Sequence, residues 1–237
     1  MTRRRWIADE FSASRAALTG PHADRLIRVL RARVGQEFDI AIGETVRRGR
    51  IAAIRDHRVE FDLAEKIPAT TQLQITLALA IFKFDRMEWV IEKCTELGVS
   101  RIVPVIADRT DARLAAAAVK RVERWRRIAQ QAAEQSRRIA PPEIAQPLKF
   151  KEGVNLPGAT RIVLAESEEE LSLKQALQSH SPDAHVILAV GPEGGWTEAE
   201  RKIFEQSGWI AASLGNTILR AETAAIAALA VVSSELY

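Results

Sequence analysis

The sequence predicts an α/β protein in which a small β-rich module precedes a larger domain of alternating strands and helices. Short runs that alternate apolar and polar residues fill much of residues 1–70. From residue 73 onward, strand-like apolar runs alternate with helical stretches, which is typical of a parallel sheet. A hydrophobic content of 47% with 27% charged residues is that of a globular chain. The predicted domains are therefore residues 1–70 and 73–237.

The first module is predicted from its turns as much as from its strands. Turn residues separate three alternating runs, which predict strands over residues 37–42, 48–54 and 58–63. One helix is expected from about Pro21 to Arg31, because proline suits the first helical turn. His57 is expected in a turn, and Pro68 with the polar residues 69–72 is predicted to link the two domains.

The second domain is predicted from five apolar runs separated by helical patterns. Buried strands are expected over residues 73–81, 101–106, 161–165, 186–190 and 210–214. Asp85 is expected to cap a helix whose apolar stripe runs from Met87 to Leu97, with Gly98 at its end. This stripe places the single cysteine, Cys94, in the core.

Three further helices follow from periodicity and capping signals. A basic helix is expected near residues 119–139, with Val122, Trp125, Ala129 and Ala132 on one apolar stripe. Thr197 and Glu200 have the spacing of a capping box for a helix that ends at Gly208. An alanine-rich helix from about Glu222 closes the chain.

Composition narrows the function classes. One cysteine excludes an intrachain disulfide and a cysteine-rich zinc site, and it favours a reducing, cytoplasmic location. No run reaches the roughly 18 apolar residues of a membrane span, so no membrane partner is expected. The arginine-rich start has no apolar stretch behind it and does not resemble a secretory signal.

Positive charge is concentrated in two zones. Residues 1–70 hold 14 Lys and Arg against 10 Asp and Glu, and residues 109–138 hold nine against three. Two separate basic zones suggest a polyanion that lies across both parts of the molecule. The alternative is a solvated arginine-rich surface, and charge alone does not decide between them.

Parallel sheets bind ligands at the carboxyl ends of their strands, which directs attention to the loops after residues 165, 190 and 214. The second loop, GPEGG at 191–195, has three glycines that permit close backbone approach. It matches neither a Walker loop nor a dinucleotide fingerprint, so a nucleoside triphosphate or dinucleotide is not indicated. A tight strand-to-helix turn is the alternative explanation.

The third loop places two large apolar residues, Ile218 and Leu219, inside a polar turn, where they can wall an apolar pocket. Arg220 and Glu222 follow directly. Their alternative roles are surface charge for Arg220 and support of the helix N-terminus for Glu222.

Taken together, GPEGG and LG..ILR.ETA, about 20 residues apart, resemble the RsmE-type family of small-subunit ribosomal RNA methyltransferases, which make N3-methyluridine in 16S rRNA. The resemblance extends to DRMEWVIEKCTELGVSRIVPV at 85–105, AEQSRR at 133–138 with Pro142, and HADRLIRVLR at 22–31. It spans nearly the whole chain, and it is specific as a set rather than in any one segment.

The resemblance implies an N-terminal PUA-like RNA-binding β-barrel and a C-terminal SPOUT methyltransferase domain with a trefoil knot. It also implies S-adenosylmethionine as cofactor, no metal, a homodimer, and 16S rRNA or the assembled small ribosomal subunit as partner. The cofactor-binding residues carried over are Leu164, Ala165, Glu166, Gly191, Pro192, Glu193, Gly194, Gly195, Leu214, Gly215, Asn216, Ile218, Leu219, Thr223 and Ala224.

Catalytic and RNA-binding roles are expected for fewer residues. Arg220 is expected to stabilise a uridine anion, and Glu222 is a weaker candidate for the general base. The expected RNA contacts are His22, Arg25, Arg28, Arg31, Arg109, Arg137 and Arg138. His22 can equally stabilise the start of its helix. Thr217 stands where the family usually has arginine, which removes one potential contact to RNA or to the partner subunit.

Two alternatives remain open at the level of sequence. One is a knotted methyltransferase that modifies another RNA nucleotide. The other is a non-catalytic RNA-binding factor in ribosome assembly.

Overall fold

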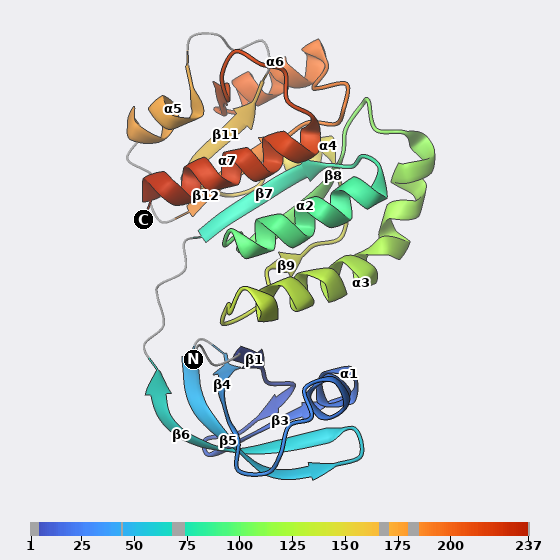
Figure 1. Cartoon of the computed structure of the whole chain (residues 1–237). Helices are drawn as coiled ribbons and strands as arrows, with labels where there is room; N and C mark the ends of the chain where they lie inside the picture. Colours follow the sequence, from blue (N-terminus) through green and yellow to red (C-terminus); the bar gives the residue numbers. More distant parts are fainter. Residues whose placement is uncertain (1–4, 44, 68–73, 166–170, 180–184, 237) are drawn as a thin grey trace. The chain divides into compact units, whose positions relative to one another are not determined.

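The computed structural model describes residues 5–43, 45–67, 74–165, 171–179 and 185–236. The chain forms two compact units, residues 1–71 with 133–141 and residues 72–132 with 142–237. Each unit is built around its own sheet (Figure 1).

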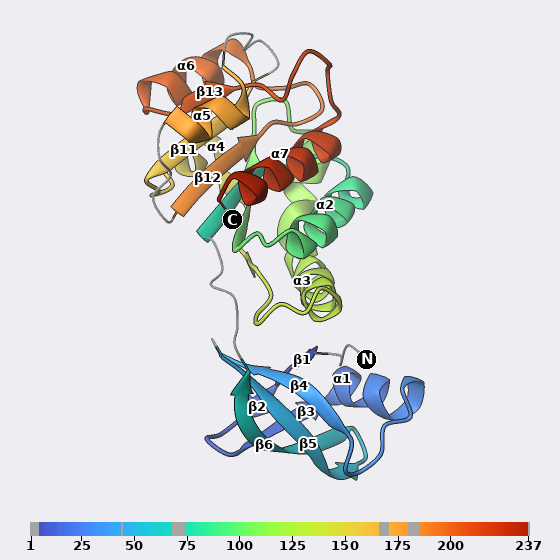
Figure 2. The ribbon, with the colours of Figure 1, turned by 60° about the vertical axis from the view of Figure 1, so that its left-hand side comes forward.

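The N-terminal unit is a curled six-stranded sheet with the strand order β1-β4-β5-β6-β3-β2 (Figure 2). Its strands are β1 (Arg5–Ile7), β2 (Glu10–Phe11), β3 (Arg15–Thr19), β4 (Glu37–Ile42), β5 (Thr45–Arg55) and β6 (Arg58–Ile67). All neighbouring strands are antiparallel except β1 and β4. Its core forms where alternating side chains such as Leu18, Ile40 and Phe61 face inward.

A short helical segment packs against this sheet. Helix α1 (Gly20–Asp24) has proline in its first turn and continues as one turn of π-helix, η1 (Arg25–Val29). Leu26 is fully buried in the core of the unit, which anchors the segment. The segment ends at Val29, with Leu30 as its C-cap, and Arg31 follows at φ 50°.

His22 lies between two carboxylates. Its Nδ1 is 2.8 Å from Asp9 Oδ1, and its Nε2 is 3.3 Å from Glu134 Oε1. The hydrogen bond with Asp9 raises the pKa of His22 above its ordinary value, with a further contribution from Glu134, although partial burial acts in the opposite direction. The contact between His22 and Glu134 therefore connects α1 to the C-terminal end of α3.

We expect His22→Gln to destabilise the protein most in mildly acidic solution. Because the folded-state pKa of His22 is raised, the stabilisation is complete below its ordinary value near 6.5 and is lost as pH rises through the raised value. The wild-type-minus-variant difference in Tm should therefore shrink from pH 5.5 to pH 8.5. A difference that grows over this range would contradict the assignment.

The C-terminal unit contains a parallel sheet with the order β10-β8-β7-β12-β11-β13, and β9 pairs with β8. The strands are β7 (Gln74–Ala80), β8 (Arg101–Ile106), β9 (Glu143–Ile144), β10 (Leu148–Lys149), β11 (Thr160–Leu164), β12 (His185–Val190) and β13 (Ile210–Ala212). The central strands β7 and β12 are apolar on both faces, as expected of a sheet that is covered on both sides.

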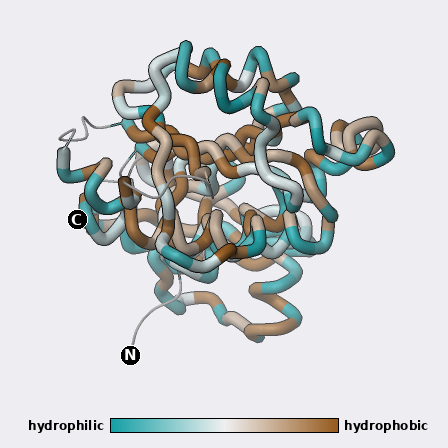
Figure 3. Tube along the Cα trace, turned by 90° about the horizontal axis from the view of Figure 1, so that it is seen from above, coloured by the Kyte–Doolittle hydropathy of each residue, from teal (hydrophilic) through white to brown (hydrophobic). Residues whose placement is uncertain are grey.

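Helices cover both faces of this sheet. One core contains residues of α2 (Phe84–Glu96), α3 (Ala112–Gln135), α5 (Leu173–Ser179) and α7 (Ala221–Leu236). The other core contains residues of α4 (Phe150–Gly153) and α6 (Glu198–Gln206). Hydrophobic and hydrophilic residues alternate along much of the trace, as expected of elements with one buried and one solvent-facing side (Figure 3).

The α/β fold with a curled N-terminal sheet and a C-terminal parallel sheet confirms the predicted fold class. Strands β4 and β8 have the predicted bounds, and the capping box at Thr197 and Glu200 is present. Cys94 is buried in the core, and His57 lies in a turn at φ 56°. The trefoil knot stays a prediction.

Two helix boundaries correct the sequence interpretation. Lys83, not Asp85, is the N-cap of α2, and Asp85 lies in the first turn, where its charge suits the helix dipole. Helix α3 begins at Ala112 rather than near 119, because Asp111 Oδ1 accepts hydrogen bonds from the amides of Arg113 and Leu114. It also ends earlier, at Gln135 rather than 139. Within the described residues, no helix has the length and apolar character needed to cross a membrane.

Candidate functional site

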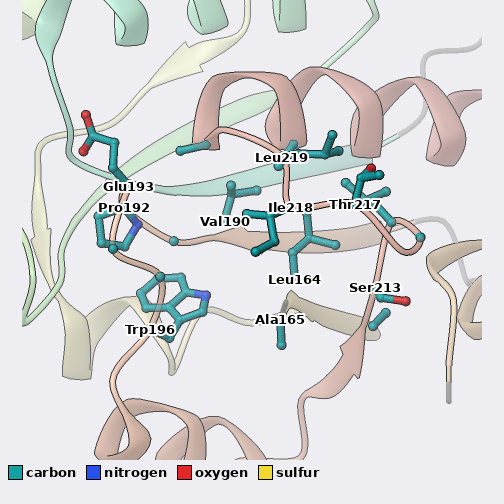
Figure 4. Close-up of a pocket in the computed structure, with 18 of the residues that line it drawn as sticks. Leu164, Ala165, Val190, Pro192, Glu193, Trp196, Ser213, Thr217, Ile218 and Leu219 are labelled. Atoms are coloured by element: carbon teal, nitrogen blue, oxygen red, sulfur yellow. The ribbon is translucent and has the colours of Figure 1, made fainter. Parts of the chain in front are cut away.

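A pocket of about 650 Å³ opens at the carboxyl ends of β11, β12 and β13, where the sequence predicts a ligand (Figure 4). Three segments line it: Leu164 with Ala165, the stretch 190–196, and the stretch 212–219. Ala221 and Ala224 of α7, Arg201 of α6 and Arg109 complete its lining. The volume lies in the range of sites that hold a cofactor-sized molecule.

Glu200 fixes the loop that follows β12. Its Oε2 accepts a hydrogen bond of 2.8 Å from the amide of Thr197, and its Oε1 accepts one of 2.8 Å from the amide of Asp108. The side chain is only 1% exposed, so both bonds form away from bulk water. The capping box therefore does more than begin α6, because it also ties the GPEGG loop to the end of β8.

Glycine is required at two positions in the pocket wall. Gly195 has φ +68° and Gly215 has φ +116°, backbone conformations that favour glycine strongly over residues with a Cβ. Gly194 is restricted by space instead, since a Cβ there would lie 3.2 Å from Cδ of Arg109. The guanidinium of Arg109 donates to the carbonyl of Gly194, which holds this backbone against β8.

One side of the pocket is apolar and the other offers polar groups. Leu164, Val190, Ile218 and Leu219 form the apolar wall, as the sequence predicts for the last two (Figure 4). Trp196 is 6% exposed and its Nε1 has no hydrogen-bond partner among the described residues. Buried indole N–H groups usually have an acceptor, so the pocket presents a donor suited to a polar ligand atom.

The structure brings most of the predicted cofactor residues together. Those that line the pocket are Leu164, Ala165, Gly191, Pro192, Glu193, Gly194, Gly195, Leu214, Gly215, Asn216, Ile218, Leu219 and Ala224. Thr223 does not line it, because the helical turn of α7 directs neighbouring residues to different sides. Glu166 lies outside the described residues. Thr217, the departure from the family pattern, also lines the pocket.

The two predicted catalytic residues have different environments. Arg220 is exposed and does not line the pocket, although its neighbours Leu219 and Ala221 do. Glu222 is 5% exposed, and its Oε1 lies 3.6 Å from Nε of Arg86 on α2. The other carboxylate oxygen of Glu222 has no hydrogen-bond partner among the described residues.

Sequence reasoning missed Arg86. Its guanidinium lies 3.6 Å from Glu222 and 3.9 Å from Glu193 in the GPEGG loop, so one cation faces two carboxylates from separate segments. Burial of a carboxylate is costly unless a cation compensates it, and Arg86 supplies that charge. Helical periodicity predicts which face of α2 is buried, but it gives no signal for contacts between α2 and α7.

We expect Arg86→Met to lower the free energy of unfolding by somewhat less than about 3 kcal/mol. Loss of one partner of a buried ion pair costs at least this much, and Arg86 is 30% exposed, so water offsets part of the loss. The double variant Arg86→Met/Glu222→Gln should recover much of the stability, because no buried charge remains. Chemical denaturation of both variants measures the coupling, and additive effects would contradict it.

The predicted RNA-binding residues fall into three groups. Arg25 and Arg28 lie on η1 and Arg31 lies two residues beyond it, and all three are exposed. Arg137 is exposed after the end of α3, whereas Arg138 is buried. Arg109 lines the C-terminal pocket, and both nitrogens of His22 already face carboxylates. No group of three or more His, Cys, Asp or Glu residues with the geometry of a metal site occurs in the described part of the chain.

Comparison with known proteins identifies relatives of this chain. The model of the RNA methyltransferase domain family matches residues 69–233. The chain is 38% identical over 167 residues to "Ribosomal RNA small subunit methyltransferase E" of Synechocystis sp., covering 69% of this chain and 54% of that protein. It is 37% identical to the protein of the same name from Bacillus subtilis, covering 68% of this chain and 66% of that protein. The matched segment thus spans about half to two thirds of these relatives.

Solved structures match over nearly the full length. A ribosomal RNA small subunit methyltransferase E from Neisseria gonorrhoeae, bound to S-adenosyl methionine, has a TM-score of 0.86 and 30% identity, and 98% of each chain is covered. A putative methyltransferase from Legionella pneumophila, in complex with the same cofactor, has a TM-score of 0.86 and 27% identity, with 99% of this chain and 98% of that chain covered.

Proposed function

Because this chain belongs to the RNA methyltransferase domain family, and within it to the ribosomal RNA small subunit methyltransferase E family, we propose that it methylates N3 of a uridine in 16S rRNA with S-adenosylmethionine as the methyl donor. The observation that carries the proposal is the pocket, where three loops meet at the carboxyl ends of parallel strands. The proposed rRNA substrate supports a cytoplasmic location.

The residues present suit S-adenosylmethionine. The apolar wall formed by Leu164, Val190 and Leu219 suits the flat face of an adenine, and the unpartnered N–H of Trp196 suits an acceptor atom. Gly195 and Gly215 let the backbone approach the ligand closely. When bound, the cofactor supplies a methyl group on a sulfonium sulfur.

The protein must first help uridine N3 to lose its proton, because the protonated nitrogen is a poor nucleophile. The resulting negative charge spreads onto O2 and O4, where a guanidinium can hold it. We assign this role to Arg220, whose exposed side chain beside the pocket is accessible to an RNA base. Alignment of N3 with the methyl group is then mainly a positioning task for the loop residues.

Glu222 is the weaker candidate for a general base. It is buried beside the pocket, and one of its oxygens lacks a hydrogen-bond partner among the described residues. Its other oxygen lies 3.6 Å from Nε of Arg86 on α2. This ion pair supports Glu222 as a residue that positions α7 near the pocket at least as well as a base.

A dimer is part of the proposal. Ile218 is 82% exposed on the loop that walls the pocket, and a second subunit or the RNA would cover this large apolar side chain. We propose a two-fold homodimer in which the partner chain borders the pocket. Light scattering at working concentration tests it, and a monomer alone would count against this part of the proposal.

One experiment tests the function as a whole. Nucleosides of 16S rRNA from a strain that lacks the gene should lose one N3-methyluridine by mass spectrometry. The purified protein with S-adenosylmethionine should restore it, on naked rRNA or on the isolated small subunit, in the presence of a metal chelator. Methylation of another nucleotide would favour a different RNA target, and failure to bind the cofactor in calorimetry would favour a non-catalytic assembly factor.

A further inference from the structure

A second cavity, of about 240 Å³, lies within the N-terminal unit. Residues from three separate segments line it: Arg5 and Trp6 of β1, Arg25 at the start of η1, and Glu134, Gln135 and Arg137 at the end of α3 and just beyond. The volume is smaller than most sites for whole cofactors, so its ligand is a small chemical group.

The cavity has hydrogen-bond donors without acceptors. Trp6 is only 3% exposed, yet its Nε1 has no hydrogen-bond partner among the described residues. Nε of Arg5 is also buried without a partner there, although another nitrogen of this guanidinium donates to the carbonyl of Arg137. Buried donors of this kind are costly, so a ligand that supplies acceptor oxygens would be bound favourably.

Positive charge exceeds negative charge around the cavity. Arg5, Arg25 and Arg137 line it together with one carboxylate, Glu134, and that carboxylate already faces His22 at 3.3 Å. The pKa of Arg5 is lowered mainly by burial, and the charge of Arg137 adds to the effect, while Asp39 partly offsets it. Among the residues that line the cavity, three guanidinium groups therefore outnumber one carboxylate.

We propose that this cavity binds one backbone phosphate of the RNA substrate. Trp6 Nε1 and the guanidinium of Arg5 donate to the phosphate oxygens from inside, and the exposed Arg25 and Arg137 close on it from the rim. A phosphate is an acceptor-only anion, which matches a site rich in donors and cations. The inference rests on the proposed function for the identity of the anion, since RNA is its source.

The first test distinguishes the hydrogen bond donated by Trp6 from the attraction of the surrounding positive charges. Trp6→Phe removes the N–H and keeps an aromatic ring, so affinity for in vitro transcribed 16S rRNA should fall by about tenfold, as expected for one hydrogen bond to a charged group. The dependence of log affinity on log salt concentration should keep its slope, because no cation is lost. Unchanged affinity of a variant that melts as the wild type does would overturn the role of Trp6.

The second test uses exposed residues whose replacement does not threaten the fold. Arg25→Gln/Arg137→Gln should reduce the salt slope by about 0.7, since each neutralised phosphate contributes about 0.7 on single-stranded RNA and the cavity holds one phosphate. The matched control is Arg15→Gln/Arg55→Gln, which removes two exposed arginines of the same unit that do not line the cavity. An equal loss of slope in the control would overturn the site in favour of diffuse attraction.

The two proposals fail in different ways. If the wild-type protein methylates 16S rRNA and the cavity variants match it in rRNA affinity and salt slope, the phosphate site is wrong and the function stands. If the wild-type protein binds 16S rRNA but does not methylate it, and the cavity variants still lose affinity as expected, the function is wrong and the site stands. Calorimetry with S-adenosylmethionine should give wild-type affinity for every cavity variant.

Discussion

Replacing Arg220 with alanine should lower the single-turnover rate of RNA methylation by about 10²–10³-fold, the loss expected for one preorganised donor to a developing anion. The effect should appear in the rate rather than in cofactor affinity, because Arg220 does not line the pocket and its interaction grows as N3 loses its proton. Stability should change little, since the side chain is exposed.

Two further variants sharpen this prediction. Arg220→Lys should recover only part of the rate, because lysine lacks the planar fork that can reach two oxygens of the base. Arg127→Ala removes another exposed arginine, on α3, and should methylate at the wild-type rate. A folded Arg220→Ala protein with wild-type turnover would remove Arg220 from the mechanism, and loss of the dimer with preserved turnover would assign it to assembly.

Gly215→Val should weaken S-adenosylmethionine binding by about a hundredfold or more. Gly215 has φ +116°, a conformation that a β-branched residue avoids at a cost of about 3 kcal/mol, so the loop 214–219 should leave its position in the pocket wall. Because this loop is largely exposed, the strain should be relieved by local movement, and Tm should fall only slightly.

Gly208→Val is the matched control for this variant. Gly208 also has a positive φ, +73°, in the same unit, but it lies after α6 and does not line the pocket. It should lower Tm at least as much and leave cofactor affinity near that of the wild type. Calorimetry and thermal melting on both variants make the comparison, and equal losses of cofactor affinity would mean that general destabilisation explains the effect.

Local sequence was sufficient to predict the scaffold of the pocket. The apolar run at 101–106 predicted both ends of β8 correctly, and the capping box at Thr197 and Glu200 predicted the start of α6. Since parallel strands end at the same edge, the GPEGG loop and the loop after Leu214 were expected to meet, and they line one cavity. These features depend on periodicity and neighbours in the chain, which a sequence displays directly.

Weaker local signals were missed or misplaced. Strands β1 and β2 have three and two residues, too short for an alternation to be recognised. The start of α3 was placed seven residues late, because the apolar stripe from Val122 was more visible than the cap at Asp111. Residues 133–141 belong to the N-terminal unit by their contacts, although they are distant from it in sequence.

The sequence by itself determined the fold class, the two sheets and the loops that form the pocket, because hydrophobic period and turn chemistry are encoded locally. Only the tertiary structure decided which charges meet. It placed Arg86 against Glu222, left Arg220 outside the pocket lining, and joined Trp6 of β1 to Arg137 beyond α3 around one cavity. Such contacts depend on how elements far apart in the chain pack together, and a carboxylate or guanidinium carries no sequence signal for its distant partner.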